Sequence, residues 1–370
     1  MVNIPLDTIH RPTLLLNEAV CRENIRLMKE KADKLGLKFR PHFKTHQSKL
    51  IGAWFREAGV KAITVSSVSM ARYFNDDSWD DITIAFPLNI RESDDIIALS
   101  GKARLNILLT MAAPLEVFCK QLGSHGNEIG VFIKIDTGYN RTGLRPDDIG
   151  EIEKIINTCR KSASLTFKGF LTHTGHTYNA RGRNEIEMIS AEAFRLLGSL
   201  RKGFDSGPDP LMLSMGDTPA CSLLDKFEGI DEIRPGNFVF YDVMQTVIGS
   251  CGPERIAVCL ACPVVSKNAS RKEVVIYGGA VHLSKESVFY KGKTIFGLVT
   301  SLTNSGWSEP YENCYLSSAS QEHGVVKVSD ELYNTIHTGD LLGVLPVHSC
   351  LTAQCMGNYL INGTIADFHM

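Results

Sequence analysis

Short apolar runs and longer amphipathic segments alternate along the first two thirds of the chain. In the longer segments, such as Asn184–Lys202, apolar residues recur every three or four positions, which is typical of helices that bury one face. The short runs do not alternate with polar residues, which is typical of strands covered on both faces. The expected strands are Thr13–Asn17, Leu37–Pro41, Ala62–Ser67, Ile82–Pro87, Leu105–Thr110, Val131–Asp136, Phe167–Thr172 and Leu211–Met215.

This strand-then-helix order predicts a parallel α/β architecture. About eight such units in about 230 residues fit a closed (β/α)8 TIM barrel, and a doubly wound open sheet is the alternative. Beyond about residue 235, short runs broken by Gly, Ser and Asn predict a second, all-β domain. The expected division is a barrel over 12–240 and a β domain over 241–370, to which 1–11 are added.

Charge and hydropathy exclude several classes of protein. The 370 residues carry 39 Lys and Arg against 41 Asp and Glu, so no strongly basic surface for nucleic acid is expected. No window approaches the roughly 18 uninterrupted apolar residues of a membrane helix. The first residues, MVNIPLDTIHRP, lack a basic region followed by an apolar run. We therefore expect a cytoplasmic protein that acts on a small molecule and has neither a nucleic-acid nor a membrane partner.

The ten cysteines are too sparse for a disulfide scaffold in a chain of 370 residues. Most of them are expected to be buried as small apolar side chains. The pair Cys259 and Cys262 has CxxC spacing, but no second pair accompanies it, so a redox or zinc-knuckle role is the less favoured interpretation.

The first candidate for chemistry is Lys44, within the segment RPHFKTH (40–46) just past the second expected strand. In a barrel, the loops that follow the strands carry the chemistry. A lysine amine can condense with an aldehyde, and partial burial lowers its pKa enough to make it nucleophilic. The alternative is a solvated lysine beside two loop histidines.

Two glycine-containing loops are further candidates. DTGYNRTG (136–143) follows the sixth expected strand and carries Arg141, whose planar cation could face a ring nitrogen, a phenolate or a carboxylate. HTGHTY (173–178) follows the seventh expected strand, and we favour a place in a cofactor pocket for His173 and Tyr178 over a metal site. Ordinary turn and hydrogen-bonding roles are the alternatives for both loops.

A small-residue turn, SMGDTP (214–219), ends the eighth expected strand and could present backbone N–H groups to a phosphate. Asp217 would add negative charge at that point, so Gly216 and Thr218 would have to bind the phosphate while the carboxylate points elsewhere. Tyr241, a little downstream, could supply a further hydroxyl to the phosphate.

The last candidate is the pair His348 and Cys350 in the β domain. On an extended segment residues i and i+2 point the same way, so both side chains could reach one ion. Imidazole with thiolate favours zinc, and two protein ligands leave positions open for water or substrate. A chance occurrence of this spacing is the alternative.

Together, RPHFKTH, DTGYNRTG, HTGHTY, SMGDTP and the late HSC (348–350) resemble, in this order, the fold-type III pyridoxal 5'-phosphate (PLP) enzymes of the D-serine dehydratase and D-threonine aldolase group. The resemblance covers most of the chain, and its lysine motif and HxC pair are the most specific parts. It implies an alanine-racemase-like architecture and a homodimer.

The resemblance also implies roles for individual residues. Lys44 would hold PLP covalently and act as the base at Cα, Arg141 would lie near the pyridine ring, and Tyr178 would line the pocket. Gly216, Thr218 and Tyr241 would hold the phosphate, and His348 and Cys350 would ligate zinc. The family's phosphate turn usually carries Ser where this chain has Asp217, which puts the phosphate assignment in doubt.

The metal pair helps to choose an activity within the group. Members with D-threonine aldolase activity generally pair the histidine with aspartate, whereas the D-serine dehydratase-like members use cysteine, as here. The expected reaction is the dehydration of D-serine or a related 3-hydroxy-D-amino acid to a 2-oxo acid and ammonia. Metal-dependent cleavage of D-threonine to glycine and an aldehyde is the alternative, and a non-catalytic PLP-binding protein is a third.

Overall fold

The computed structural model describes residues 5–123, 127–205 and 210–369, and it divides the chain into two compact units. Unit 1 comprises Met1–Arg26, Thr45–Trp54 and Asn237–Met370. Unit 2 comprises Leu27–Lys44 and Phe55–Gly236. Both units are discontinuous in sequence, whereas the sequence predicts crossings only between residues 11 and 12 and between residues 240 and 241. Helices α1 and α2 each begin in unit 1 and end in unit 2; their bounds are Glu18–Lys34 and Lys49–Glu57.

Unit 2 contains an eight-stranded parallel sheet in the order β2-β9-β8-β7-β6-β5-β4-β3. The apolar strands β5, β6 and β7 form its middle, and every residue of β6 is buried. The strands are β2 Lys38–Phe39, β3 Ile63–Val65, β4 Asp81–Pro87, β5 Arg104–Leu109, β6 Ile129–Lys134, β7 Leu165–Thr172, β8 Met212–Met215 and β9 Glu232–Ile233.

The parallel sheet closes on itself just beyond β2. His42 forms an isolated parallel bridge with Thr64 of β3, which joins the two ends of the strand order. The Thr64 N–H donates to the Pro41 carbonyl at 2.9 Å, and the Phe43 N–H donates to the Thr64 carbonyl at 2.8 Å. This closure confirms the predicted barrel and excludes the open doubly wound sheet.

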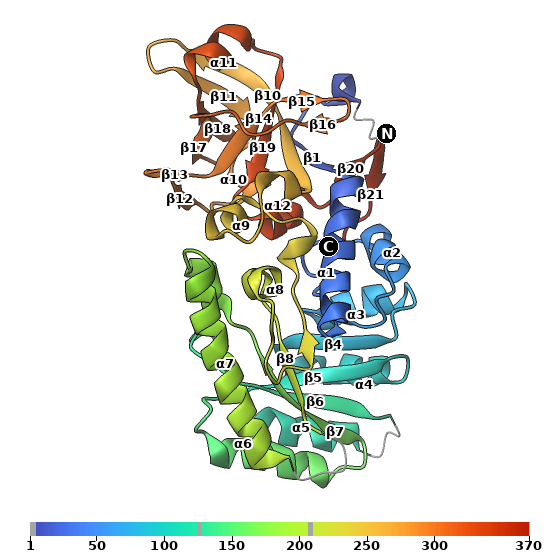
Figure 1. The fold of residues 1–370 in the computed structure, drawn as a ribbon. Coiled ribbons are helices and arrows are strands. Elements are labelled where there is room, and N and C mark those ends of the chain that lie inside the picture. The colour runs from blue at the N-terminus through green and yellow to red at the C-terminus, as the bar shows by residue number, and fades with distance from the viewer. Residues whose placement is uncertain (1–4, 124–126, 206–209, 370) are drawn as a thin grey trace. The chain divides into compact units, whose positions relative to one another are not determined.

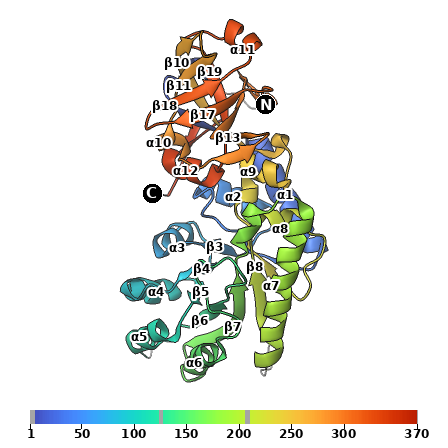
Figure 2. The ribbon, with the colours of Figure 1, turned by 90° about the vertical axis from the view of Figure 1, so that its left-hand side faces the viewer.

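Amphipathic helices cover the outside of the barrel strands, as Figure 2 shows for α3 to α7. Each buries one apolar face; in α6 that face consists of Ile152, Ile155, Ile156 and Cys159, at helical spacing. None of the helices in the described part of the chain is both long and apolar enough to cross a membrane. The helices of unit 2 are α3 Val68–Asn75, α4 Ser93–Ser100, α5 Ala112–Leu122, α6 Ile149–Arg160, α7 Arg183–Phe204 and α8 Thr218–Leu223, with the 3-10 helices η2 Ile90–Glu92 and η3 Gly175–Asn179.

Unit 1 is built on a nine-stranded sheet in the order β11-β18-β17-β14-β19-β10-β1-β20-β21, drawn with its labels in Figure 1. A further pairing between β10 and β11 closes six of these strands into a small antiparallel barrel. Its strands are β1 Thr13–Leu16, β10 Val258–Asn268, β11 Glu273–Tyr277, β14 Gly297–Thr300, β17 Tyr315–Ala319, β18 His323–Lys327, β19 Leu341–Pro346, β20 Tyr359–Ile361 and β21 Thr364–Ala366.

Short elements complete unit 1. Two small hairpins pair β12 with β13 and β15 with β16. The α-helices are α9 Val243–Ile248, α10 Ala280–Leu283, α11 Asp330–Thr335 and α12 Ser349–Met356, the 3-10 helices are η1 Leu6–Thr8, η4 Asn237–Val239 and η5 Pro253–Arg255, and the hairpin strands are β12 Val288–Tyr290, β13 Lys293–Ile295, β15 Leu302–Thr303 and β16 Gly306–Trp307.

One expected barrel strand belongs to the other sheet. Thr13–Leu16 pairs antiparallel with β10 and, at Leu15, parallel with β20, so β1 is part of unit 1. The eighth barrel strand is Glu232–Ile233, which the apolar pattern did not reveal because it has only two residues and one of them is charged. A buried apolar run indicates a strand, but it does not say which of two sheets the strand joins.

The cysteines are distributed as the composition predicts. All ten are free, and six of them are buried. Cys259 and Cys262 both lie within β10, where burial raises the pKa of each thiol.

Two glycine substitutions should change the stability of unit 2 in opposite directions. Gly169 in β7 has a φ of +138°, and a Cβ there would overlap the Met212 carbonyl of β8. Gly169→Ala should therefore lower the free energy of unfolding by about 1–3 kcal/mol or more. Gly198 in α7 has open space around its Cβ position, so Gly198→Ala should raise stability by up to about 1 kcal/mol. Urea unfolding of both variants measures this contrast, and equal effects would contradict it.

Candidate functional site

The residues expected to form the cofactor pocket lie in loops that follow neighbouring barrel strands. Lys44 follows β2, Arg141 follows β6, His173 and Tyr178 follow β7, and Gly216 follows β8 directly. Because parallel strands end at the same edge of a sheet, these loops share one end of the barrel, where (β/α)8 enzymes place their chemistry. With Thr218, which begins α8, unit 2 thus contains six of the predicted site residues.

Lys44 is an exposed lysine that follows a firmly packed backbone. The preceding residue, Phe43, has no exposed surface, and its ring lies about 5 Å from three other aromatic rings. The His42 N–H donates to the Pro235 carbonyl, and the Lys44 N–H donates to His42 Nδ1 at 3.4 Å. The three rings around Phe43 are those of Phe55, Phe74 and Trp79. The backbone that carries Lys44 is therefore fixed by side-chain packing and by hydrogen bonds.

Positive charge dominates this end of the barrel. Burial lowers the pKa of His42 well below its ordinary value, and neighbouring cations lower it further. Lys134, at the end of β6, is only 6% exposed, and its pKa falls to about 8, first because of burial and then because of the Arg141 charge, while Asp136 opposes the shift. Three cations act on both groups: Lys44, Arg141 and Arg234.

His173 is held as a neutral imidazole. Burial lowers its pKa to about 3, so it carries no charge at neutral pH. Its Nδ1 contacts the Gly216 carbonyl, which can only accept, so we assign the proton to Nδ1 and leave Nε2 as an acceptor. The ring of Tyr178 lies 6.4 Å from that of His173, which places both predicted pocket residues together.

Asp217 caps a helix instead of facing the phosphate turn. Its Oδ1 accepts from the Ala220 N–H at 2.8 Å, as the N-cap of α8, and from Thr177 Oγ1 at 2.9 Å. Its Oδ2 accepts from Thr174 Oγ1. The carboxylate is therefore turned toward α8 and the 174–177 loop, which answers the objection that its charge would oppose an anion at Gly216.

Arg234 is a site residue that the sequence analysis left without a role. It is 4% exposed, and its Nε donates to Ser214 Oγ at 2.7 Å while its Nη2 donates to the Thr172 carbonyl at 2.6 Å. Ser214 in turn donates to Glu232 at 2.6 Å, and Glu232 accepts from Arg40 at 2.7 Å. Its position directly after β9 could have revealed it, but β9 itself was missed.

The structure places only two of the three residues assigned to the phosphate, Gly216 and Thr218, in the same unit. Gly216 lies against Arg234, since a Cβ there would come within 2.7 Å of the Arg234 carbonyl. Thr218 begins α8, and both residues belong to unit 2. Tyr241 belongs to unit 1, where it is 6% exposed and has a φ of +48°, a strained value for a residue with a side chain. The phosphate role of all three residues stays a prediction.

His348 and Cys350 lie together in unit 1 and form a charged pair. Burial disfavours the imidazolium, but the hydrogen bond and charge of Cys350 outweigh it and raise the pKa of His348 to about 9. Burial likewise raises the pKa of Cys350, yet its hydrogen bond to His348 lowers it overall. Both shifts favour transfer of the thiol proton to the imidazole, and a thiolate is the form of cysteine that binds metals.

The geometry of the pair differs from the extended segment that the sequence predicts. His348 is the N-cap residue of α12, with φ −135° and ψ 97°, and Cys350 lies in the first turn of that helix. The two side chains meet across a helix start instead of along a strand. The two residues have the same spacing in both geometries. The sequence pattern therefore indicated the pair, although the extended conformation assumed for it was wrong.

Buried groups hold the first turn of α12 in place. Asp242 accepts from the Ser349 N–H at 3.0 Å and from Asn237 Nδ2 at 2.6 Å. Asn237 Nδ2 also lies 3.5 Å from Cys350 Sγ. On the other side, Thr45 Oγ1 lies 3.3 Å from Cys350 Sγ. Among the described residues no group of three or more His, Cys, Asp and Glu side chains could hold a metal ion, and the zinc role of His348 and Cys350 stays a prediction.

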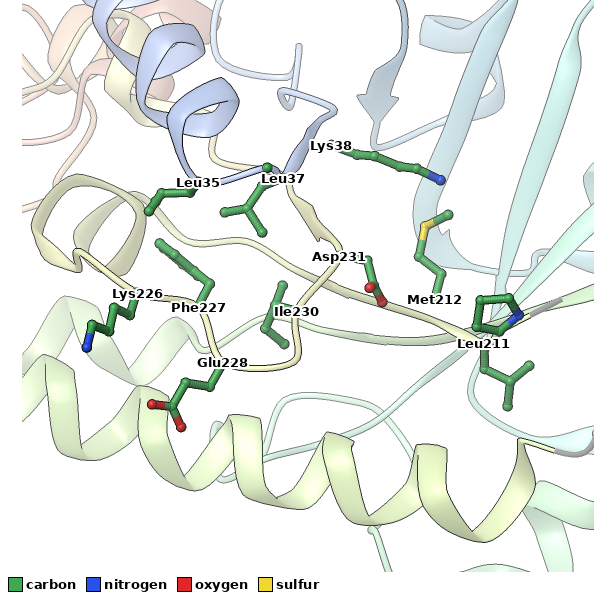
Figure 3. Close-up of a pocket in the computed structure, with 12 residues that line it drawn as sticks. Leu35, Leu37, Lys38, Leu211, Met212, Lys226, Phe227, Glu228, Ile230 and Asp231 are labelled. Atoms are coloured by element: carbon green, nitrogen blue, oxygen red, sulfur yellow. The ribbon is translucent and has the colours of Figure 1, made fainter.

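A cavity of unit 2 lies at the opposite end of the barrel strands. It has a volume of about 520 Å³ and is lined by residues that precede β2, β8 and β9, including Leu37, Leu211 and Asp231 (Figure 3). Asp231 is engaged by Arg201 at 2.8 Å. Since (β/α)8 enzymes place their chemistry at the carboxyl ends of the strands, we do not assign the active site to this cavity.

Two family models match the chain. Residues 16–243 match the model for the alanine racemase N-terminal domain, and residues 257–362 match the model for a putative serine dehydratase domain. The chain belongs to the alanine racemase N-terminal domain family. The predicted resemblance to fold-type III PLP enzymes is thereby confirmed.

Three proteins illustrate what this family member is similar to. A D-serine dehydratase from Dictyostelium discoideum is 29% identical over 96% of this chain and 94% of that protein. A D-threo-3-hydroxyaspartate dehydratase from Delftia sp. (strain HT23) is 26% identical over 94% of this chain and 92% of that protein. Its solved structure matches with a TM-score of 0.89 and 23% identity over 98% of each chain. A D-threonine aldolase from Arthrobacter sp is 25% identical over 64% of this chain and 63% of that protein.

The pocket of this alanine racemase family member fits PLP by its charge and by its exposed amine. PLP is an anionic aldehyde, and the carboxyl end of the barrel offers an exposed lysine whose charge acts on Lys134 together with those of Arg141 and Arg234. Lys44 would hold the aldehyde carbon. A neutral His173 and the ring of Tyr178 would flank the pyridine ring.

Replacing Lys134 should change how the stability of the metal- and PLP-free protein depends on pH. The pKa of Lys134 is about 8 in the fold and near 10.5 when unfolded, so between these values the unfolded chain binds more protons. Stability should therefore rise with pH in this window, by up to about 1.4 kcal/mol per unit. Lys134→Met should remove this rise. Urea unfolding at pH 8, 9 and 10 measures it, and identical slopes for wild type and variant would count against the assignment.

Proposed function

We propose that this chain is a PLP- and zinc-dependent dehydratase that converts D-serine or a related 3-hydroxy-D-amino acid to a 2-oxo acid and ammonia. The dehydratase relatives, which align with more than nine tenths of the chain, support a PLP-dependent lyase. The observation that carries the zinc-assisted reaction is the contact between Thr45 and Cys350 in unit 1.

That contact links the two candidate centres through the chain itself. Thr45 lies 3.3 Å from the Cys350 sulfur and is joined by a peptide bond to Lys44. Consecutive Cα atoms are about 3.8 Å apart, so covalent geometry alone limits how far the lysine backbone can be from the His348 and Cys350 pair. The proposed reaction requires a substrate held at Lys44 to present its β-hydroxyl to that pair.

The residues at the barrel end have separate tasks in the proposed reaction. PLP, when bound, draws electron density from the bonds at the substrate Cα. Lys44 would remove the Cα proton. His173, which is neutral, would flank the bound cofactor, and Arg234 would fix the surrounding strand ends through Ser214 and the Thr172 carbonyl.

The metal pair assists the departure of the β-hydroxyl. Zinc is a Lewis acid that stabilises negative charge on an oxygen. His348 and Cys350 supply imidazole and thiolate, a donor set that favours zinc over hard cations such as Mg²⁺. The hydroxyl leaves with a proton as water, and the released enamine takes up water to give the oxo acid and ammonia, so the reaction loses and regains one water.

Retro-aldol cleavage of D-threonine is the second candidate, because the Arthrobacter D-threonine aldolase is also a relative. In that reaction the β-hydroxyl is deprotonated and the Cα–Cβ bond breaks. The shorter match and the thiolate at position 350 favour dehydration. The homodimer and the cytoplasmic location that the sequence analysis expects remain part of the proposal.

The products formed from D-serine and from D-threonine test the proposed reaction. The purified protein with PLP and zinc should release ammonia and pyruvate from D-serine, and chelation should lower that rate by at least about 100-fold. Lys44→Ala should lose the visible absorption of the bound cofactor and at least about 100-fold in rate. Release of glycine from D-threonine without pyruvate from D-serine would favour the aldolase, and full turnover by Lys44→Ala would refute the lysine assignment.

The zinc site is tested by a matched pair of cysteines in α12. Cys350→Ala should lose bound zinc while the fold is kept, because one of two protein ligands is removed. Cys355→Ala, at an exposed position of the same helix, should keep its zinc. Zinc per chain by elemental analysis and the thiolate-to-metal absorption of a Co²⁺-loaded protein report the outcome. Full metal content in Cys350→Ala would remove the cysteine from the site.

A further inference from the structure

Arg141 is a cation of the pocket whose side chain has no polar support from the described residues. It is exposed, and within residues 5–123, 127–205 and 210–369 its guanidinium forms neither a hydrogen bond nor an ion pair. Arg234, by contrast, is fixed by two short hydrogen bonds. A long, exposed arginine loses side-chain entropy when it is ordered, so something must hold it if it is to face a ligand.

The ring of Tyr139 is the contact that orients Arg141. The guanidinium carbon of Arg141 lies 5.0 Å from the centroid of that ring, within the range of a cation–π interaction. Both residues belong to one tight turn, in which Asp136 Oδ1 accepts from the N–H groups of Gly138 and Asn140 at 3.0 Å each. The turn fixes where the ring and the cation leave the backbone.

The HTGHTY loop fixes the ring itself. The ring of His173 meets Tyr139 edge-on at 5.7 Å, and the ring of His176 stacks on it at 6.4 Å with a 22° interplanar angle. Gly175 allows this approach, because a Cβ there would lie only 2.5 Å from Tyr139 Cε1. The two glycine-containing motifs therefore interlock through one tyrosine.

We propose that Tyr139 is a positioning residue that holds the Arg141 guanidinium toward the cofactor ring through its aromatic face. This inference rests on the proposed function, because it assigns Arg141 to the PLP pocket. The hydroxyl of Tyr139 has no part in it: among the described residues that oxygen makes no hydrogen bond, and only the ring contacts Arg141, His173 and His176.

Variants at positions 139 and 141 test the proposal by cofactor affinity. The apo-protein is titrated with PLP and the absorbance of the bound cofactor gives a dissociation constant. Tyr139→Leu should raise it by roughly 3- to 30-fold, the range that a cation–π contact spans. Tyr139→Phe keeps the ring and should restore the constant to within about 2-fold of wild type. In an Arg141→Gln background, Tyr139→Leu should have little further effect, because the cation that the ring holds is gone.

Two further variants separate this role from general damage. Gly175→Ala displaces the ring without removing it and should resemble Tyr139→Leu. Tyr333→Leu removes a ring that lies under Lys267 and Lys272 in unit 1 and should leave PLP affinity unchanged. A Tyr139→Phe variant as weak as Tyr139→Leu would overturn the proposal in favour of a hydroxyl contact, and equal losses with and without Arg141 would also overturn it. A wild-type chain that binds no PLP would instead refute the proposed function.

Discussion

Thr64 closes the barrel, and the position of Lys44 depends on that closure. The backbone of Thr64 pairs with the Pro41 and Phe43 backbone, and its hydroxyl donates to the Arg40 carbonyl at 2.9 Å. These hydrogen bonds pair the segment after β2 with β3. Without them the parallel sheet would end at β2 and the barrel would stay open. A barrel strand of only two residues can carry the proposed catalytic lysine because the segment that continues the strand is paired on both sides.

The barrel end brings several positively charged side chains close together, and their burial costs stability. Lys134 and Arg234 are almost fully buried, and burial lowers the pKa of each, to about 8 and about 10. Glu232 offsets part of that cost through Ser214 and Arg40. An anionic cofactor would add negative charge beside these cations, so stability without the cofactor and affinity for it oppose each other at this end of the barrel.

The loops of the site are organised by small contacts between motifs that are distant in sequence. Asp217 caps α8 and accepts from two threonines of the 174–177 loop, and Tyr139 reaches the same loop at Gly175. In unit 1, Asp242 and Asn237 set the start of α12, on which Cys350 lies. Each functional loop is thus held by side chains of another loop, which makes single motifs poor guides to geometry.

The sequence by itself determined the parallel barrel, the second β domain and the loops that carry Lys44, Arg141 and His173, because buried strands and strand ends leave a local pattern. Only the tertiary structure assigned β1 to the antiparallel sheet, showed Glu232–Ile233 as a strand and turned Asp217 toward α8. It also showed that Arg234 belongs to the site and that Tyr139 lies under Arg141. These features depend on pairing partners far away along the chain, and an apolar run or a turn motif specifies its own conformation but not its partner.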